Sequence, residues 1–401
     1  MGMTKRHGRI TGWGMYVPDR VLTNHDLEQM VDTNDEWIVS RTGIRERRIA
    51  EAGETSSTMS VEAAQRALAR AEVSPEELDL IIIATSSPDY FTPPVSSMVQ
   101  DQLGATRAGA FTLGAGCTGF VYALVTASQF IESGMYDKIL VIGVEHLSIA
   151  VDWTDRNTCV LFGDGAAAVV LEMSCQPTGV LSAELGSQGK DWDALIFPGG
   201  GSAKPFGEQT LPNKEQYLRM DGRRVFKFAT RAMADSTRRV VRESGLSWGD
   251  IELLIPHQAN ARIIDLAVRR LKIDPAKVMV NVDRYGNTSA ASIPLALCEA
   301  ADQGRLKSGD HLVMVGFGAG LTWAATVVHW QPEKVDEAPI LVEDWPIRER
   351  LRQPVTSLRN AMWSAGVAVR SRLQEASTVL LLPLYTWQGR WRKRRRQQDE
   401  K

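Results

Sequence analysis

Short apolar runs alternate along this chain with longer stretches in which apolar residues recur at helical spacing, and this alternation restricts the fold more than any other feature. The first part has strand-like runs at residues 78–84, 138–143 and 166–171 and helical patterns at 60–71 and 120–133. The second part repeats the scheme, with helical patterns at 225–244 and 261–271 and strand-like runs at 251–255, 311–315 and 324–330. This order predicts a layered α/β architecture with two similar halves.

The composition is that of a globular protein with a sizeable core. The chain has 401 residues, of which 44% are hydrophobic and 23% charged, which is enough for two halves that each bury apolar side chains. Its four cysteines lack paired spacing, which argues against a disulfide framework or a zinc site and favours a reducing compartment. The apolar residues 10–17 are interrupted by glycines, so no secretion signal is indicated. We expect a cytoplasmic protein with no resident metal or cofactor.

The segment 331–401 differs in charge from the rest of the chain. From residue 346 onward there are 13 Lys and Arg residues against 4 Asp and Glu, although the whole chain has a net charge of -2. Residues 333–345 are acidic and contain a proline, which is typical of a linker. Farther along, apolar residues at helical spacing precede three aromatic residues and the basic run 392–396.

Two interpretations of residues 355–396 stay open. The apolar part is too short and too often interrupted to span a bilayer. It could instead form an amphipathic anchor at a membrane surface, with aromatic side chains at the interface and a basic end. The other interpretation is a helix that packs on the body of the protein and leaves a solvated basic end. Nucleic-acid binding is a distant third, because nothing else in the chain supports it.

Cys117 is the strongest candidate for chemistry. It lies in the segment Leu-Gly-Ala-Gly-Cys-Thr-Gly-Phe at 113–120, where a strand-like run changes directly to a helical one. A thiol in the first turn of a helix is expected to favour its thiolate, because the helix dipole and unpaired N–H groups stabilise negative charge. The alternative is a small buried hydrophobe, which is how we interpret Cys159, Cys175 and Cys298.

His257 and Asn287 supply the groups that such a nucleophile needs. His257 follows the apolar run 253–255 and so ends a strand, which is where functional groups of α/β proteins gather. A buried structural histidine is the alternative. With Asn287 in the following segment 281–289, these residues suggest a Cys-His-Asn acyl-transfer site.

Six short motifs occur in the order and at about the distances found in β-ketoacyl-[acyl-carrier-protein] synthase III, which the chain resembles over roughly residues 8–330. The motifs are Asp-Glu-Trp-Ile at 35–38 followed by Arg-Thr-Gly-Ile at 41–44, the segment around Cys117, Phe-Gly-Asp-Gly-Ala at 162–166, His-Gln-Ala-Asn at 257–260, Asn287, and Gly-Phe-Gly-Ala-Gly at 316–320. The resemblance implies a thiolase-like, five-layered α-β-α-β-α fold with two pseudo-symmetric halves. It places these halves at 1–175 and 176–330, adds a C-terminal helical extension at 331–401, and implies a homodimer.

The resemblance also implies the reaction, a decarboxylative Claisen condensation of an acyl-CoA with malonyl-[acyl-carrier-protein] that initiates fatty acid or related acyl-chain synthesis. Cys117 would carry the acyl group, and His257 and Asn287 would stabilise the enolate formed by decarboxylation. Backbone N–H groups of Cys117, Gly318 and Ala319 would form the second oxyanion hole. The family generally has three glycines where this chain has Gly-Ala-Gly at 318–320, and alanine is tolerated there unless the turn requires a positive φ.

Several further residues match binding positions of the family. The residues expected to bind coenzyme A are Trp37, Arg41 and Arg156. The alternative for these is structural: Trp37 packs a helix against the core, and Arg156 pairs with Asp155 or a neighbouring carboxylate. The residues expected to dock the acidic carrier protein are Lys227, Arg262, Arg269 and Arg270. Of these, Arg269 and Arg270 could equally be a solvated helix face.

The loop 90–94 corresponds to the one that closes the acyl pocket across the dimer. Short-chain members place an aromatic residue near the position of Thr92, so a small residue there favours a longer pocket and a medium or long acyl-CoA. Phe91 could refill the space.

Two other functions remain open. One is an acyltransferase that moves the acyl group of Cys117 to an alcohol or amine without decarboxylation. The other is a catalytically silent partner that binds carrier protein or a membrane, against which the complete Cys-His-Asn set argues. Thiolase itself is disfavoured because residues 316–320 lack a second cysteine, and a Cys-His-His synthase is disfavoured by Asn287.

Overall fold

Two β-sheets form the body of the protein in a computed structural model that describes residues 5–333. The first sheet has the strand order β1-β7-β6-β4-β5 and consists of β1 (His7–Tyr16), β4 (Leu80–Ala84), β5 (Gly109–Leu113), β6 (Lys138–Glu145) and β7 (Gly165–Ser174). The second has the order β11-β12-β13-β8 and consists of β8 (Gly179–Ser187), β11 (Leu253–Pro256), β12 (His311–Gly318) and β13 (Thr322–His329). The chain divides into two units at residue 335, and all described residues belong to the first.

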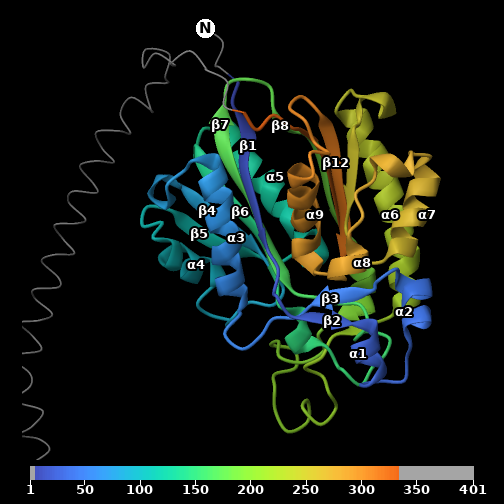
Figure 1. Cartoon of the computed structure of the whole chain (residues 1–401). Helices are drawn as coiled ribbons and strands as arrows, with labels where there is room; N and C mark the ends of the chain where they lie inside the picture. The colour runs from blue at the N-terminus through green and yellow to red at the C-terminus, as the bar shows by residue number, and fades with distance from the viewer. Residues whose placement is uncertain (1–4, 334–401) are drawn as a thin grey trace, which may run out of the picture. The chain divides into compact units, whose positions relative to one another are not determined.

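Helices cover both faces of each sheet and complete five layers (Figure 1). Two helices pack on the outer face of the first sheet, namely α3 (Ser56–Ala71) and α4 (Val95–Leu103). The helices between the sheets are α5 (Gly119–Glu132) and α9 (Ser292–Asp302). Those on the outer side of the second sheet are α6 (Gly222–Glu243) and α7 (Ala261–Leu271). The layer order α-β-α-β-α is the predicted one, whereas the predicted C-terminal helical extension lies outside the described residues.

The two sheets follow one plan. The order β1-β7-β6-β4 of the first corresponds to β8-β13-β12-β11 of the second. A parallel bridge between Leu254 and Val278 occupies the place that β5 has in the first sheet. The prediction of two similar halves is therefore confirmed in the strand order.

Most predicted strands and helices agree with the structure to within a few residues, but β1, β5, β8, α4 and α9 have no counterpart among the predicted ranges. Helix α9 is the longest buried element among these. Residues 292–298 of this helix are all buried, because the helix is enclosed between the two sheets. A helix that is buried on every side has no polar face, and so its sequence lacks the periodic pattern that reveals a surface helix.

The remaining elements are short. They are α1 (Asn24–Glu28), α2 (Asp35–Thr42), α8 (Val282–Tyr285), β2 (Val21–Thr23), β3 (Glu46–Arg48), β9 (Leu195–Ile196) and β10 (Arg219–Met220). Gly43 ends α2 with a φ of +78°, and a Cβ added there would lie 2.4 Å from the Cβ of Ala261. Glycine thus lets the end of α2 touch the beginning of α7, which brings Trp37 of α2 near the candidate site.

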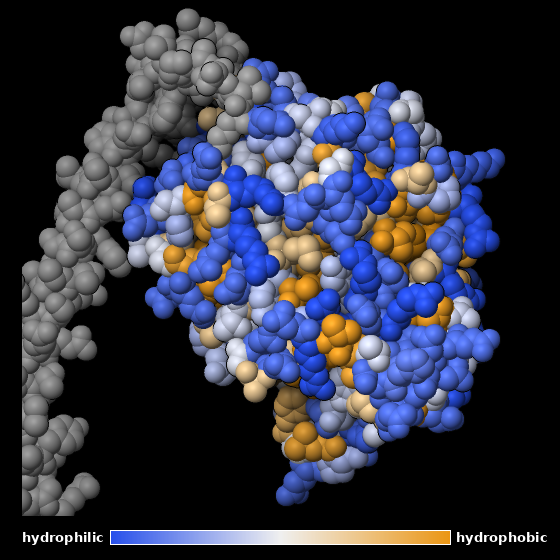
Figure 2. Space-filling model, in the orientation of Figure 1, coloured by the Kyte–Doolittle hydropathy of each residue, from blue (hydrophilic) through white to orange (hydrophobic). Residues whose placement is uncertain are grey.

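The described surface is mixed in polarity. Figure 2 shows one face, on which hydrophobic side chains are exposed in separate small patches among hydrophilic ones. Within residues 5–333, no helix has both the length and the apolar character needed to cross a membrane.

Candidate active site

Cys117, His257 and Asn287 come together at one buried cavity. Cys117 lies in the 3₁₀ turn Gly116–Thr118 that leads into α5, His257 directly follows β11, and Asn287 follows α8. All three side chains line a cavity of about 250 Å³, and each residue is less than 10% exposed. Residues that are far apart in the sequence therefore meet at the ends of elements from both halves, as the sequence predicts.

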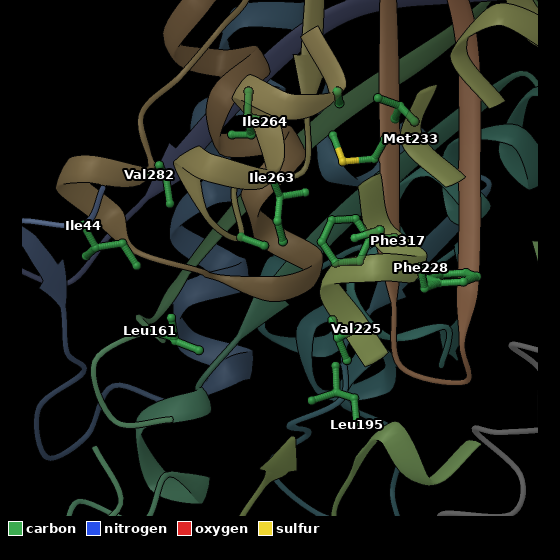
Figure 3. Packing of buried hydrophobic residues seen from close by; sticks show 14 of the residues in the cluster. Ile44, Leu161, Leu195, Val225, Phe228, Met233, Ile263, Ile264, Val282 and Phe317 are labelled. Atoms are coloured by element: carbon green, nitrogen blue, oxygen red, sulfur yellow. The ribbon is translucent and has the colours of Figure 1, made fainter. Parts of the chain in front are cut away.

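The rest of the cavity wall is largely apolar. Its hydrophobic side chains include Leu161, Leu195, Val225, Ile263 and Phe317, which come from separate elements (Figure 3). Such a wall excludes water from a thioester bound at Cys117 and accommodates an acyl chain.

Glycines allow the Cys117 turn to pack against the end of β12. A Cβ added to Gly318 would lie 2.6 Å from the backbone nitrogen of Cys117 and 3.1 Å from its Cβ. Gly116 has a φ of +54°, and a Cβ there would lie 3.0 Å from the nitrogen of Ala319. The two Gly-rich motifs thus pack closely against each other. A side chain at either of these glycines would force the backbone of the turn to move.

Two backbone amides point at the nucleophile. The N–H groups of Cys117 and Ala319 both act on the Cys117 sulfur and lower the pKa of the thiol. Ala319 is not among the residues with positive φ, whereas Gly320 has a φ of +134°. The alanine in this motif is therefore compatible with the turn, as predicted. Gly318 serves the site through its small size.

The ionisation of Cys117 differs from the sequence prediction. Burial raises the pKa of the thiol to about 11, although the neighbouring Ser289 side chain and the two amides lower it. The prediction of a favoured thiolate is wrong in the resting site, because desolvation outweighs the helix terminus. The thiol must lose its proton before it can act as a nucleophile.

His257 is held as a neutral hydrogen-bonding group. Its backbone N–H donates to the oxygen of Val315 (2.8 Å), and its Nδ1 contacts the hydroxyl of Ser292. The Ser292 oxygen accepts the Gln258 N–H (3.4 Å), and we assign its own hydroxyl as a donor to Nδ1 of His257. Nδ1 is then unprotonated, and the ring proton lies on Nε2. Nε2 has no hydrogen-bond partner among residues 5–333, and burial lowers the pKa of the ring to about 3. A neutral imidazole therefore presents one free donor.

Asn287 is oriented by two hydrogen bonds. Its backbone N–H donates to Leu161 (2.8 Å), and its Oδ1 accepts from the N–H of Ser289 (2.9 Å). The Nδ2 group makes no hydrogen bond within the described part of the chain and is left as a donor for the cavity. Gly163 permits this arrangement, because a Cβ there would lie 2.4 Å from the oxygen of Tyr285. The motif at 162–166 thus positions Asn287.

Comparisons with known proteins identify the family. Models of 3-oxoacyl-[acyl-carrier-protein] synthase III match residues 111–189, and of its C-terminal region residues 241–330. A β-ketoacyl-[acyl-carrier-protein] synthase III of Desulfitobacterium hafniense (strain Y51) is 54% identical over 326 residues, which is 81% of this chain and 98% of that protein. One from Symbiobacterium thermophilum is 56% identical over 321 residues, covering 80% and 97%. The chain belongs to the β-ketoacyl-[acyl-carrier-protein] synthase III family.

Solved structures show the same fold. The crystal structure of 3-oxoacyl-[acyl-carrier-protein] synthase III from Aquifex aeolicus VF5 is 47% identical, has a TM-score of 0.75, and covers 80% of this chain and 100% of its own. The priming β-ketosynthase of the R1128 polyketide pathway is 37% identical with a TM-score of 0.77, covering 83% and 99%. The described body therefore has the thiolase-like α/β fold of this enzyme family.

The three residues expected to bind coenzyme A lie together in this synthase III family member. The guanidinium carbons of Arg41 and Arg156 are 4.8 Å and 5.2 Å from the centroid of the Trp37 ring. Trp37 and Arg41 line the cavity, whereas Arg156 lies beside it and donates to the backbone oxygen of Asp32 (3.0 Å) and to its carboxylate. Arg156 pairs with Asp32 and not with Asp155.

The basic residues expected to dock the carrier protein separate into three places. Arg262 lines the catalytic cavity and lies over the Phe226 ring at 6.0 Å. Lys227 and Arg270 line a second hollow, of about 630 Å³, beside α6 and α7. Arg269 is exposed and lines neither.

The acyl-pocket candidates are not at the cavity of their own chain. Phe91 is 83% exposed, Thr92 is also exposed, and neither lines the cavity. Phe91 therefore does not refill the pocket of the chain to which it belongs.

Three side chains of the site could not be recognised in the sequence. Ser292 contacts His257, and Ser289 connects Cys117 with the carboxylate of Glu145, which ends β6. Serines and a glutamate carry no recognisable spacing signal, and only the fold brings them beside the nucleophile.

Proposed function

We propose that this protein is an acyltransferase that condenses an acyl-CoA starter with malonyl-[acyl-carrier-protein] and so initiates fatty acid synthesis. The observation that supports this most strongly is the arrangement of Cys117, His257 and Asn287 around one buried cavity in a member of this family. Each of the three presents a group of the kind that one step of the reaction needs.

Acylation takes place at Cys117. The thiolate attacks the thioester carbonyl, and the tetrahedral oxyanion develops beside the sulfur. The N–H groups of Cys117 and Ala319 already point toward this position. Removal of one donor from such an oxyanion hole typically costs about 10²–10³ in rate, so two preset donors make a large contribution.

Decarboxylation of the malonyl group uses the other two residues. Loss of carbon dioxide leaves an enolate, whose oxygen needs hydrogen-bond donors but no proton acceptor. The neutral Nε2–H of His257 and the Nδ2 group of Asn287 are the free donors at the cavity. The enolate carbon then attacks the acyl-cysteine, which gives a 3-oxoacyl product and restores the thiol.

The two substrates are recognised by different parts of the surface. Trp37, with Arg41 and Arg156 against its ring, offers a flat surface and two cations for the nucleotide portion of coenzyme A. The exposed basic side chains of α6 and α7, including Lys227, attract an acidic carrier protein.

A homodimer would complete the acyl pocket. Strand β5 lies at the edge of the first sheet with its side chains only partly covered, and Phe91 is exposed nearby in sequence. An uncovered apolar edge strand favours pairing with another chain. In such a dimer the loop 90–94 enters the partner's cavity, and the small Thr92 leaves room for a medium or long acyl chain.

The proposal assigns residues 1–175 to the half that carries the nucleophile and 176–330 to the half that carries His257 and Asn287. The possible membrane contact of residues 355–396 falls outside the described residues.

Intact-protein mass spectrometry tests the proposal. The wild-type protein and Cys117→Ala are mixed with a panel of acyl-CoAs, and malonyl-[acyl-carrier-protein] is then added while carbon dioxide is measured. An acyl adduct that requires Cys117 and disappears with release of carbon dioxide supports the synthase. An adduct that is never discharged onto the malonyl substrate supports an acyltransferase without decarboxylation, and no adduct with any starter contradicts both.

A further inference from the structure

The catalytic thiol lacks an obvious proton acceptor. His257 Nε2 makes no hydrogen bond among residues 5–333, so it does not contact the sulfur in the way that a histidine base contacts its nucleophile. Its neutral state, with a pKa lowered to about 3 by burial, also makes it a poor base. The deeply buried Cys117 thiol nevertheless has to ionise before acylation.

On its other side, the sulfur lies beside a serine that is hydrogen-bonded to a carboxylate. The turn that begins at Ser289 packs on the turn of Cys117, the Ser289 side chain influences the pKa of the thiol, and the Ser289 hydroxyl donates to Oε1 of Glu145 at 3.0 Å. A hydroxyl that donates to the carboxylate has its oxygen free to accept the S–H of Cys117. Both Ser289 and Glu145 are buried, at 4% and 0% exposure.

The backbone holds this serine in place. Ser289 has a φ of +47°, which is unusual for a residue with a side chain. Its N–H donates to Oδ1 of Asn287 at 2.9 Å, so one residue connects the nucleophile, the amide donor and the carboxylate. A non-glycine residue in this conformation at a site is a reason to look for a role for its side chain.

Glu145 is suited to accept and return a proton. Its carboxylate also receives the N–H of Ser86 (3.1 Å) and the hydroxyl of Ser87 (2.6 Å). These hydrogen bonds lower the pKa of Glu145, but burial has the larger effect and raises it to about 7. The other titratable groups nearby are Cys117 itself, His146, which follows β6, and Asp164, which precedes β7; the side chains of His146 and Asp164 lie 4.0 Å apart. Among these groups, Glu145 is the one that is connected to Cys117 through Ser289 and also has a pKa near neutrality.

We propose that Ser289 and Glu145 form a proton relay that accepts the thiol proton of Cys117 during acylation. The S–H bond breaks as an O–H bond forms on Ser289, while the original Ser289 proton moves to Glu145 and leaves a neutral carboxyl. The thiolate bonds to the acyl carbon, the bond from that carbon to the CoA sulfur breaks, and the CoA thiolate takes the proton back through Ser289. Thiol and acyl-CoA thus become acyl-cysteine and free CoA without any further reactant. As a step of acylation by acyl-CoA, the relay rests on the proposed function.

Two rates at Cys117 test the relay as a function of pH. One is acylation by an acyl-CoA, measured by mass spectrometry, and the other is alkylation by iodoacetamide, which needs no acyl-CoA site. In the wild type both rates rise through a step near pH 7, where Glu145 becomes the free acceptor. In Glu145→Gln this step is lost, and acylation at neutral pH falls by about 10²-fold, as expected when a general base is removed.

Two further variants separate the relay from structural damage. Ser289→Gly suits the positive φ, keeps the N–H bound to Asn287 and removes the CH2OH side chain with its hydroxyl, so it also loses the step near pH 7. Ser87→Ala removes a hydrogen bond to the same carboxylate away from Cys117. It retains the step but moves it to higher pH, because that bond lowers the pKa of Glu145.

Each outcome decides something specific. If Glu145→Gln keeps the wild-type pH profile and rates, Glu145 is not the acceptor. If Ser289→Gly keeps them, the proton does not pass through Ser289. Carbon dioxide release by enzyme that has already been acylated stays unchanged in both variants, and its loss would indicate general damage and overturn the relay. If the wild type is alkylated but forms no acyl adduct, the proposed function fails, and the alkylation profile still decides the relay.

Discussion

The contact between Gly318 and Cys117 predicts that Gly318→Ala inactivates acylation without unfolding the protein. The added methyl group would lie 2.6 Å from the Cys117 nitrogen, 3.1 Å from its Cβ and 3.2 Å from its Cα, so three atoms of the nucleophile are crowded at once. Because two of the crowding atoms belong to the backbone, the strain cannot be relieved by a side-chain rotation, and the turn at 116–118 has to move.

The size of the effect follows from these distances. Ordinary contacts begin at about 3.4 Å, so the nucleophile moves by roughly 0.5–1 Å, and a misplacement of about 1 Å can cost on the order of 10² in rate. Overpacking of a buried site costs about 1–3 kcal/mol of stability, which a 401-residue protein with its large core should survive. We expect acylation of Cys117 to fall by about 100-fold, with a modest loss of thermal stability.

The assay is the rate of acyl adduct formation by intact-protein mass spectrometry, with thermal unfolding recorded on the same samples. Gly114→Ala is the matched control, because a Cβ at Gly114 meets no atom within 4 Å and its φ is not positive. It should acylate at the wild-type rate. If Gly318→Ala acylates within a few-fold of Gly114→Ala, the packing argument is refuted.

Three further predictions follow from the site. Asn287→Ala should lower carbon dioxide release by about 10²–10³, because the enolate loses a donor, and should affect acylation much less, since there only the acceptor of the Ser289 N–H is lost; decarboxylation at the wild-type rate would disprove this role. Trp37→Ala should raise the KM for acyl-CoA without slowing alkylation of Cys117, whereas Trp192→Ala, at an exposed tryptophan that does not line the cavity, should change neither. His257 has a pKa of about 3 when folded and about 6.5 when unfolded, so the unfolded state binds the extra proton between these values and stability is lost as pH falls. In urea unfolding, the wild type should therefore lose about 1.4 kcal/mol per pH unit relative to His257→Asn across this range, and a flat difference would contradict the assignment of a neutral imidazole.

Much of the fold could be predicted from the sequence because its strands are short continuous apolar runs and its outer helices have an apolar face at helical spacing. Strand β4 lies close to the predicted run at 78–84, and α6 begins three residues before the predicted helix at 225. Helix α9 could not be predicted, because it contacts both sheets and therefore has no polar face over residues 292–298 to produce a periodic pattern. The five-layer order was implied by the resemblance to the synthase III family and not by the residue pattern, because it depends on which helices are enclosed and which lie outside.

The candidate site divides in the same way. The sequence by itself determined that Cys117, His257 and Asn287 are the reactive groups, because their flanking glycines and strand ends are local features of the chain. Only the tertiary structure decided their ionisation and their partners. Burial in the folded body raises the pKa of the thiol, although the helix terminus alone predicts a favoured thiolate. The electrostatic environment of a side chain is a sum over many atoms, and its hydrogen-bond partners, such as Ser289, come from segments that are distant in sequence. Both therefore exist only once the chain has folded.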